Sequence, residues 1–333
     1  MNVIKIIDPP SIIAGAAVVG EKERGGPLGD KFDLHDATGT FGMNTWEKAE
    51  SEMQRLAVNT ALSKAKLENT DLDVIFAGDL LNQCVGSTYG ILGFETAYLG
   101  IYGACSTFTE GLLIASLTAG AGYFKKCAVV TSSHFCTAER QFRFPNEYGG
   151  QRPPTSQWTV TGAGAAILSL GGDGPYITDV LPGIPVDKGI KDANNMGAAM
   201  APAAIDTFNR YFSETKTQPS DYDLILTGDL GAEGHGIVCD FMKNAGYDMT
   251  KNYNDCGLLI YGRKTQDVHS GGSGCGCAAS VFSAYILDKI KSGELNDIIF
   301  AATGALMNSD SIKQGNSIPG IAHLVHITNK RSR

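Results

Sequence analysis

The chain has 333 residues, of which 43% are apolar and only 19% charged, so it can bury one large or two medium hydrophobic cores. Its net charge of -8 provides no field that would attract a polyanion, and we expect no nucleic-acid partner. No stretch reaches the roughly 18 continuous apolar residues of a membrane-spanning helix, and the first residues lack a signal-peptide pattern. We therefore expect a soluble protein of the cytoplasmic type. The eight cysteines include no CxxC pair and no histidine at zinc-ligand spacing, which predicts no metal site.

The first clear element along the chain is a helix that begins near residue 45. Asn44 is expected to cap this helix, and Glu47 follows it at the spacing of a capping box. Apolar side chains then recur at helical spacing, beginning with Trp46, Ala49 and Met53. The pattern predicts a helix that separates two strands.

The next strand is part of an internal repeat. Residues 73–80 read DVIFAGDL, and residues 223–230, which lie 150 positions later, read DLILTGDL. Each string is a short apolar run that ends in Gly-Asp. Such a run is typical of a buried parallel strand whose C-terminal end opens into a loop.

Two further repeats occur in the same order. The string GACSTFTEGLL from Gly103 matches GCGCAASVFSA from Gly274, and both read as a turn, a helix and a following strand. A weaker match sets TGAGAAILSL from Thr161 over IPGIAHLVHI from Ile318. Three ordered matches indicate a duplicated α/β unit with parallel strands and helices on the faces of the sheets. We place the division at a glycine-rich turn, which gives an N-terminal half of 1–172 and a C-terminal half of 173–333.

Cys105 lies at the predicted turn between a buried strand and the start of a helix. The helix macrodipole at such a turn stabilises anions and favours a thiolate. The sequence therefore predicts a pocket that contains Cys105, with a buried and inert thiol as the alternative.

These motifs resemble known families. The GACST turn, the duplicated halves and SGGSGCGCAAS in the second half are similar to the thiolase superfamily, especially ketoacyl-acyl carrier protein synthase III. The strings GDLLNQ, TSSH, QFRFPNEYGGQRP, AMAPAA and DYDLILTGDL resemble the stage V sporulation protein AD family along nearly the whole chain. The resemblance implies a thiolase-like fold of five αβαβα layers, a homodimer, and a Cys nucleophile in the catalytic relatives at the position of Cys105.

The chain departs from the catalytic pattern at two positions. The resemblance implies a histidine after the strand at 223–227, where this chain has Asp229, and an asparagine where it has Cys275. His235 or His269 could substitute only from several residues away. Because a carboxylate opposes an oxyanion instead of stabilising it, we expect the chain not to be a condensing enzyme. The alternative is an acyltransferase that uses Cys105 on acyl thioesters.

The resemblance further implies a sporulation protein that binds dipicolinic acid, with or without calcium, for its uptake into the spore. The other stage V sporulation A membrane proteins would be its partners, at the inner forespore membrane, and no cofactor is expected. A third possibility is a scaffold with a vestigial pocket. The expected ligand-binding residues offer backbone N–H groups, hydroxyls, thiols or charges: Cys105, Thr131, Ser132, Ser133, His134, Arg143, Asp229, Gly274 and Cys275. Arg140 and Arg152 could equally be solvated or paired with carboxylates.

Overall fold

The computed structural model describes residues 2–141 and 152–330. One continuous strand path runs through the molecule in the order β11-β10-β13-β14-β9-β2-β8-β6-β4-β5. The path joins two five-stranded halves through a single residue pair, Ser11 with Tyr176. The first half contains β2 (Ser11–Gly20), β4 (Val74–Gly78), β5 (Ala97–Gly100), β6 (Lys126–Ser133) and β8 (Gly162–Ser169). The second contains β9 (Tyr176–Leu181), β10 (Leu224–Thr227), β11 (Tyr253–Asp255), β13 (Asp297–Ala305) and β14 (Gly320–Thr328).

The two halves have the same strand order and the same strand directions. In the first half β4 is parallel to β5 and β6, whereas β8 is antiparallel to β6 and β2. In the second half β10 is parallel to β11 and β13, whereas β14 is antiparallel to β13 and β9. The repeated sequence strings fall on these equivalent elements, with β4 matching β10, β6 matching β13 and β8 matching β14. The prediction of duplicated α/β halves is confirmed.

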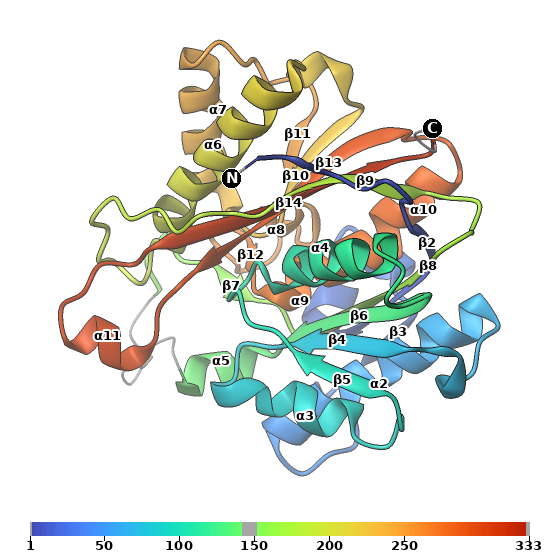
Figure 1. Ribbon diagram of the computed structural model, residues 1–333. Helices are drawn as coiled ribbons and strands as arrows, with labels where there is room; N and C mark the ends of the chain where they lie inside the picture. The colour runs from blue at the N-terminus through green and yellow to red at the C-terminus, as the bar shows by residue number, and fades with distance from the viewer. Residues whose placement is uncertain (1, 142–151, 331–333) are drawn as a thin grey trace.

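Helices cover each half and also fill the space between the halves (Figure 1). The outer helices are α2 (Trp46–Ala65) and α3 (Val85–Ile91) on the first half, and α6 (Met196–Thr215) and α7 (Gly231–Asn244) on the second. The inner layer contains α4 (Thr107–Gly120), then α9 (Cys275–Val281), which continues through a π-helical segment (Phe282–Ile286) into α10 (Leu287–Lys291). Because α4 packs against strands of both halves, the arrangement has the five expected αβαβα layers.

Aromatic packing in the inner layer holds the halves together. Phe282 stacks on Phe300 with ring centroids 5.1 Å apart, and Phe108 lies 5.7 Å from Phe282. All three side chains are fully buried. Each buried Phe stabilises the fold by about 1.5–3 kcal/mol relative to an exposed one, so this layer is a common core rather than a loose domain boundary.

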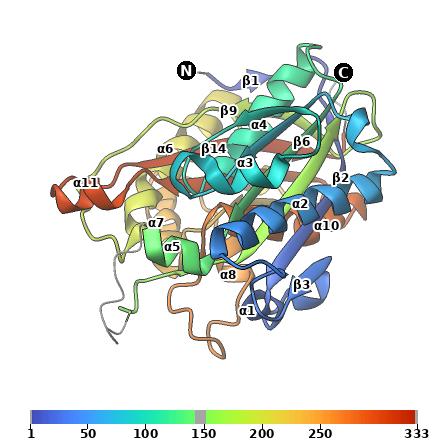
Figure 2. The same ribbon diagram turned by 90° about the horizontal axis from the view of Figure 1, so that it is seen from below.

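The short elements lie at the edges of this framework. They are β1 (Ile4–Lys5), α1 (Glu21–Arg24), β3 (Leu34–Asp36), α5 (Phe135–Gln141), β7 (Trp158–Thr159), α8 (Cys256–Leu259), β12 (Gly272–Ser273) and α11 (Ser309–Lys313). The connection between β13 and β14, which carries α11, extends beyond the body of the molecule (Figure 2). Within the described residues, no helix combines the length and the apolar character needed to cross a bilayer.

One predicted helix cap is wrong. The N-cap of α2 is Thr45, whose hydroxyl accepts a hydrogen bond from the Lys48 backbone N–H, and not Asn44. Both residue types cap helices well, and only the backbone conformation decides between neighbours. Glu47 does not complete a capping box and instead forms an ion pair with Arg140.

Candidate ligand-binding site

The Cys105 turn is held in a tight conformation by its own hydrogen bonds. Ala104 has a positive φ of 52°, which is uncommon for a residue with a side chain. The Gly103 carbonyl accepts from the Ser106 hydroxyl, while the Gly103 N–H donates to Thr107 Oγ1. As a result the Cys105 thiol lies just before the first turn of α4, and the residue is 6% exposed.

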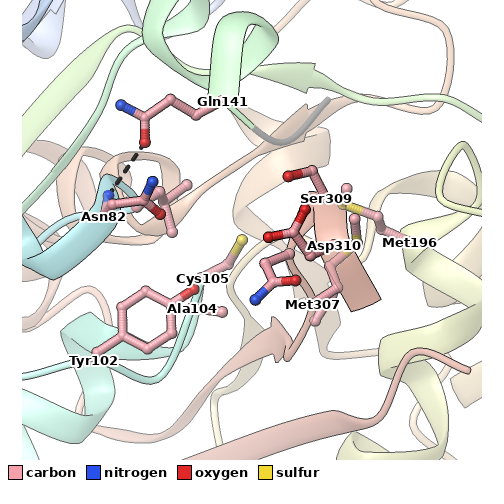
Figure 3. A pocket seen from close by; sticks show the side chains of 12 residues that line it. Asn82, Tyr102, Ala104, Cys105, Gln141, Met196, Met307, Ser309 and Asp310 are labelled. Carbon is pink, nitrogen blue, oxygen red and sulfur yellow. Dashed lines mark hydrogen bonds between the residues drawn. The ribbon is translucent and has the colours of Figure 1, made fainter. Parts of the chain in front are cut away.

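The Cys105 thiol faces a cavity of about 120 Å³ (Figure 3). Asn82 and Tyr102 lie on one side of the sulfur, and Met307, Ser309 and Asp310 lie on the other. The remaining lining residues are Leu80, Ala104, Ala305 and Asn308 of the same three segments, with Gln141 and Met196 from two further ones. Cys105 therefore lines a pocket, and its part in binding a ligand stays a prediction.

A wider groove of about 410 Å³ adjoins this pocket. The two cavities share five lining residues, which are Leu80, Asn82, Tyr102, Met307 and Asn308. A ligand at the sulfur could therefore extend past Tyr102 into the groove.

Asp229, which stands where the resemblance implies a histidine, contacts the Cys105 thiol. Its carboxyl is completely buried and hydrogen-bonds to that thiol. The same carboxyl accepts hydrogen bonds from the Gly274 N–H at 2.9 Å and from Thr303 Oγ1 at 3.1 Å. Burial raises the pKa of Asp229 to about 7, although these donors and the thiol lower it. Near neutral pH this carboxyl is therefore partly protonated, and it cannot replace the imidazole of a histidine.

Cys275 and Gly274 lie behind the pocket and do not line it. The Cys275 thiol donates to the Ser132 carbonyl at 2.9 Å, and burial raises its pKa well above the usual value. Gly274 has a φ of +107°, and a Cβ there would come within 2.6 Å of Ser133 Oγ. Glycine is thus needed at this position for the backbone that presents the Gly274 N–H to Asp229.

The three hydroxyl residues at the end of β6 do not reach the pocket either. Thr131 donates to the Cys275 carbonyl, Ser132 to Glu50, and Ser133 to the Val160 carbonyl, all at 2.7–3.0 Å. Because side chains alternate along a strand, these hydroxyls face the helices on the two sides of the sheet.

The predicted basic residues do not line the described part of the pocket. His134 is 2% exposed and its Nε2 lies 2.8 Å from the Gly39 carbonyl oxygen, so it has a structural role. Arg140 pairs with Glu47, and Arg152 pairs with Asp267 at 3.6 Å, which agrees with the paired alternative. Arg143 lies outside the described residues.

Neither histidine that could have replaced the missing imidazole lines the pocket. The His235 ring stacks on Tyr253 with centroids 4.4 Å apart. The His269 Nε2 lies 3.2 Å from Asp267 Oδ1. Both side chains therefore have partners elsewhere in the second half.

The sequence analysis missed most of the pocket wall. Asn82 belongs to the GDLLNQ string, but nothing in that string marks its amide as a pocket group. Tyr102 and Gln141 flank predicted elements, and Met307 to Asp310 belong to the connection between β13 and β14. This connection meets residues 80–84 only through the tertiary fold, so no local pattern identifies it.

The described part of the pocket wall has polar side chains but no basic one. It offers three side-chain amides, a phenol and a hydroxyl, and its one ionisable carboxylate is Asp310. Among its described lining residues there is no lysine, arginine or histidine. Over residues 2–141 and 152–330, no group of three or more His, Cys, Asp or Glu side chains is placed to hold a metal ion.

Comparisons with known proteins assign the fold and the family. Solved structures similar to this chain include 3-oxoacyl-[acyl-carrier-protein] synthase III from Aquifex aeolicus VF5, which has 15% identity and a TM-score of 0.56 over 95% of this chain and 99% of that one. Human mitochondrial 3-ketoacyl-CoA thiolase in complex with CoA has 11% identity and a TM-score of 0.58 over 98% and 99%. These likenesses confirm the thiolase-like fold.

Closer similarity exists to sporulation proteins. The stage V sporulation protein AD of Bacillus subtilis (strain 168) is 44% identical over 315 residues, which is 95% of this chain and 93% of that protein. The sequence model of the family described as "Stage V sporulation protein AD (SpoVAD)" matches residues 1–328. The chain therefore belongs to the stage V sporulation protein AD family and is a sporulation protein.

Proposed function

We propose that this protein binds dipicolinic acid, pyridine-2,6-dicarboxylate, in the Cys105 pocket and takes part in its uptake into the developing spore. Family membership supports a role in sporulation. The pocket supports a small ligand, because it is preformed, faces a helix start and contains several polar groups among apolar ones. The family resemblance and the polar groups of this wall support dipicolinic acid as the ligand.

The contact between Cys105 and Asp229 carries the proposal. Condensation of acyl thioesters needs donors that stabilise an oxyanion, and an ionised carboxylate opposes that charge. A neutral Asp229 could donate one hydrogen bond, but its carboxyl already contacts the thiol, Gly274 and Thr303. The site therefore keeps a pocket while it lacks the groups that would make it a condensing enzyme.

The wall also favours calcium as a companion of the ligand. A free dianion would be repelled by the Asp310 carboxylate, and no described lining side chain offsets the repulsion. A calcium ion prefers carboxylate and amide oxygens, which Asp310, Asn82 and Asn308 can supply. Tyr102 and Met307 provide apolar surface on either side of a flat ring.

The expected partners are further copies of the chain and membrane proteins of the same sporulation group. Strand β5 ends the strand path, and large apolar side chains near it are solvent-exposed: Tyr89 (64%), Leu92 (73%), Leu99 (48%) and Tyr102 (50%). Pairing of two β5 edges would cover these groups in a homodimer. We place the protein at the surface of the inner forespore membrane, bound through its membrane partners.

Acyl transfer is the second candidate, because the thiol of Cys105 does line the pocket. In that reaction the acyl group would pass from the coenzyme A sulfur to Cys105, and the Cys105 proton would pass to the departing thiol. Asp229 could accept that proton on the way, since its pKa lies near 7.

Two measurements on the full chain separate these candidates. Calorimetric titration with dipicolinate should give saturable binding that strengthens in calcium and weakens in a chelator. Asp310→Asn should reduce the gain from calcium, whereas Asp240→Asn on the exposed face of α7 should leave it unchanged. Intact-mass analysis after incubation with acetyl-coenzyme A should show no adduct.

The opposite results would change the assignment. A stable acyl adduct with turnover and no dipicolinate binding would favour the transferase. Neither binding nor acylation would leave the scaffold interpretation.

A further inference from the structure

A pair of buried carboxyls lies behind the Cys105 pocket and is not used by the proposed function. Glu50 on α2 and Asp79 after β4 are both completely buried. A point at the Cβ position of Gly86 would lie 3.2 Å from Asp79 Oδ2 and 3.5 Å from Glu50 Cγ, so the two side chains are neighbours. Two neighbouring ionised carboxylates in a dry interior would repel each other strongly.

One amide links the two carboxyls into a single hydrogen-bond network. Gln54 Nε2 donates to Ser132 Oγ at 2.8 Å and to Ser87 Oγ at 3.0 Å. Ser132 Oγ in turn donates to Glu50 at 3.0 Å, and Ser87 Oγ donates to Asp79 at 2.6 Å. The donors are therefore directed at the carboxyls from both sides, which suits a negative charge or a shared proton better than a metal cation.

The same network contains a buried acceptor to which no described group donates a hydrogen bond. The side chain of Gln54 is 0% exposed, and its Oε1 has no hydrogen-bond partner among the described residues. Gln54 lies one helical turn after Glu50 on the same face of α2. The network therefore has an acceptor left over, which a proton on the carboxyl pair could satisfy.

No cation neutralises the pair within the described residues. Neither carboxyl forms an ion pair there, and burial raises the pKa of both groups, that of Glu50 to about 8 with a further contribution from Asp79. The ionisable groups that face the pair from neighbouring elements are thiols and phenols: Cys84, Tyr98, Tyr102 and Cys275.

The pair is joined to the pocket through the backbone after Asp79. The Asp79 carboxyl accepts hydrogen bonds from the N–H groups of Leu81 at 2.8 Å and Ser87 at 2.6 Å. Between these two residues, Gln83 and Cys84 have positive φ values of 57° and 53°, a conformation that needs support from its surroundings. Leu80 and Asn82 of this segment line the Cys105 pocket.

We propose that Glu50 and Asp79 share one proton at neutral pH, and that loss of this proton loosens segment 79–91 and with it one wall of the Cys105 pocket. The released proton goes to solvent and leaves two buried negative charges. This control of the pocket wall is independent of which ligand the pocket holds.

Hydrogen exchange of the full chain, followed by mass spectrometry from pH 6 to pH 9 and corrected for intrinsic rates, tests the proposal. The opening equilibrium of segment 79–91 should rise by up to about tenfold per pH unit until the pair is ionised. The equivalent helix segment 231–244 should not follow it. Glu50→Gln should abolish the rise, because the amide is neutral and carries no titrating proton, while Thr137 can still donate to the His134 carbonyl.

Glu52→Gln, on the same helix but paired with Arg55 outside this network, is the matched control and should behave as the unchanged protein does. If Glu50→Gln does not fold, Asp79→Asn provides the same test by removing one charge of the pair. The proposal is overturned if segment 79–91 shows no pH dependence in the unchanged protein, or if the rise persists in either amide variant.

Discussion

The two halves of the molecule place a buried aspartate at the same point and use it differently. Asp79 follows β4 and Asp229 follows β10, 150 positions later. Asp79 accepts from the backbone of its own half, whereas Asp229 accepts from Gly274 and contacts Cys105 across the interface between the halves. A duplicated framework thus fixes where a carboxyl lies but not what it does.

The neighbouring helices account for the difference. On α2 the buried face carries Glu50 and Gln54, and 150 positions later α6 carries Met200 and Ala204, which are also buried. The polar helix side chains next to Asp79 therefore have no counterpart at these positions of α6. The carboxyl in the second half reaches the pocket only through its contact with the Cys105 thiol, so we expect Asp229 to act on Cys105 and Asp79 on the backbone of segment 79–91.

The largest expected effect comes from a feature that only the second half has. His326 on β14 lies between Asp179, at 2.8 Å, and Asp297, whereas Ile167 occupies the equivalent register on β8. His326→Gln should destabilise the fold by about 3–5 kcal/mol at pH 7, because it leaves two carboxylates without the cation between them. Ile167→Val, the matched first-half change, should cost only about 1 kcal/mol. Chemical denaturation measures both values.

The same triad gives a pH dependence with a definite sign. Burial lowers the pKa of His326, but the hydrogen bonds that its ring donates to the two aspartates, and their charges, outweigh it and raise the pKa to about 9. The stabilisation is therefore complete below the unfolded pKa near 6.5 and is lost as the pH rises through about 9. Melting curves from pH 6 to pH 10 should show this loss in the unchanged protein, and an equal loss in His326→Gln would refute it.

The next largest effect is expected when the equivalent aspartates Asp79 and Asp229 are replaced in turn. Asp229→Ala should cost about 2–3 kcal/mol, because the Gly274 N–H loses its buried acceptor. It should also alter the rate at which an alkylating reagent modifies Cys105. Asp79→Ala should destabilise by a similar amount but act mainly on exchange in segment 79–91. If the two variants perturb the same peptides, the division of roles between the halves is wrong.

A smaller effect is expected from the two equivalent glycines at the starts of the inner helices. Gly274→Ala should cost about 1–3 kcal/mol, because its φ is +107° and the new Cβ would lie 2.6 Å from Ser133 Oγ. In Gly103→Ala the backbone has no positive φ, and the new Cβ meets only side-chain atoms, the Glu110 carboxyl and the Ser106 hydroxyl, each at 2.7 Å. Thermal denaturation should therefore rank Gly274→Ala well below Gly103→Ala, and the reverse order would count against the assigned role of Gly274.

The smallest effect should come from the surface of the first half. Arg55 pairs with Glu52 at 2.5 Å on α2, with the arginine side chain 46% exposed. Arg55→Ala should change the free energy of unfolding by about 0.5 kcal/mol or less, because solvent screens such pairs. A cost above about 1.5 kcal/mol would mean that α2 is held by more than its buried face.

The sequence predicted the framework and only the centre of the site. Repeated strings located β4, β10 and the Cys105 turn, because each pattern is local and occurs twice. The hydroxyls of Thr131, Ser132 and Ser133 were expected at the ligand, but strand alternation and the two helix layers give each an internal partner. Pocket residues such as Asn308 and Asp310 could not be predicted, since they reach Cys105 only through the packing of a long connection against a distant segment.

Protection of Cys105 from alkylation tests the central claim most directly. The full chain is treated with iodoacetamide at increasing dipicolinate concentrations, with and without calcium, and modification of Cys105 and Cys84 is measured by peptide mass spectrometry. The account predicts saturable protection of Cys105 by the ligand, strongest with calcium. Modification of Cys105 at an unchanged rate under saturating ligand would contradict it.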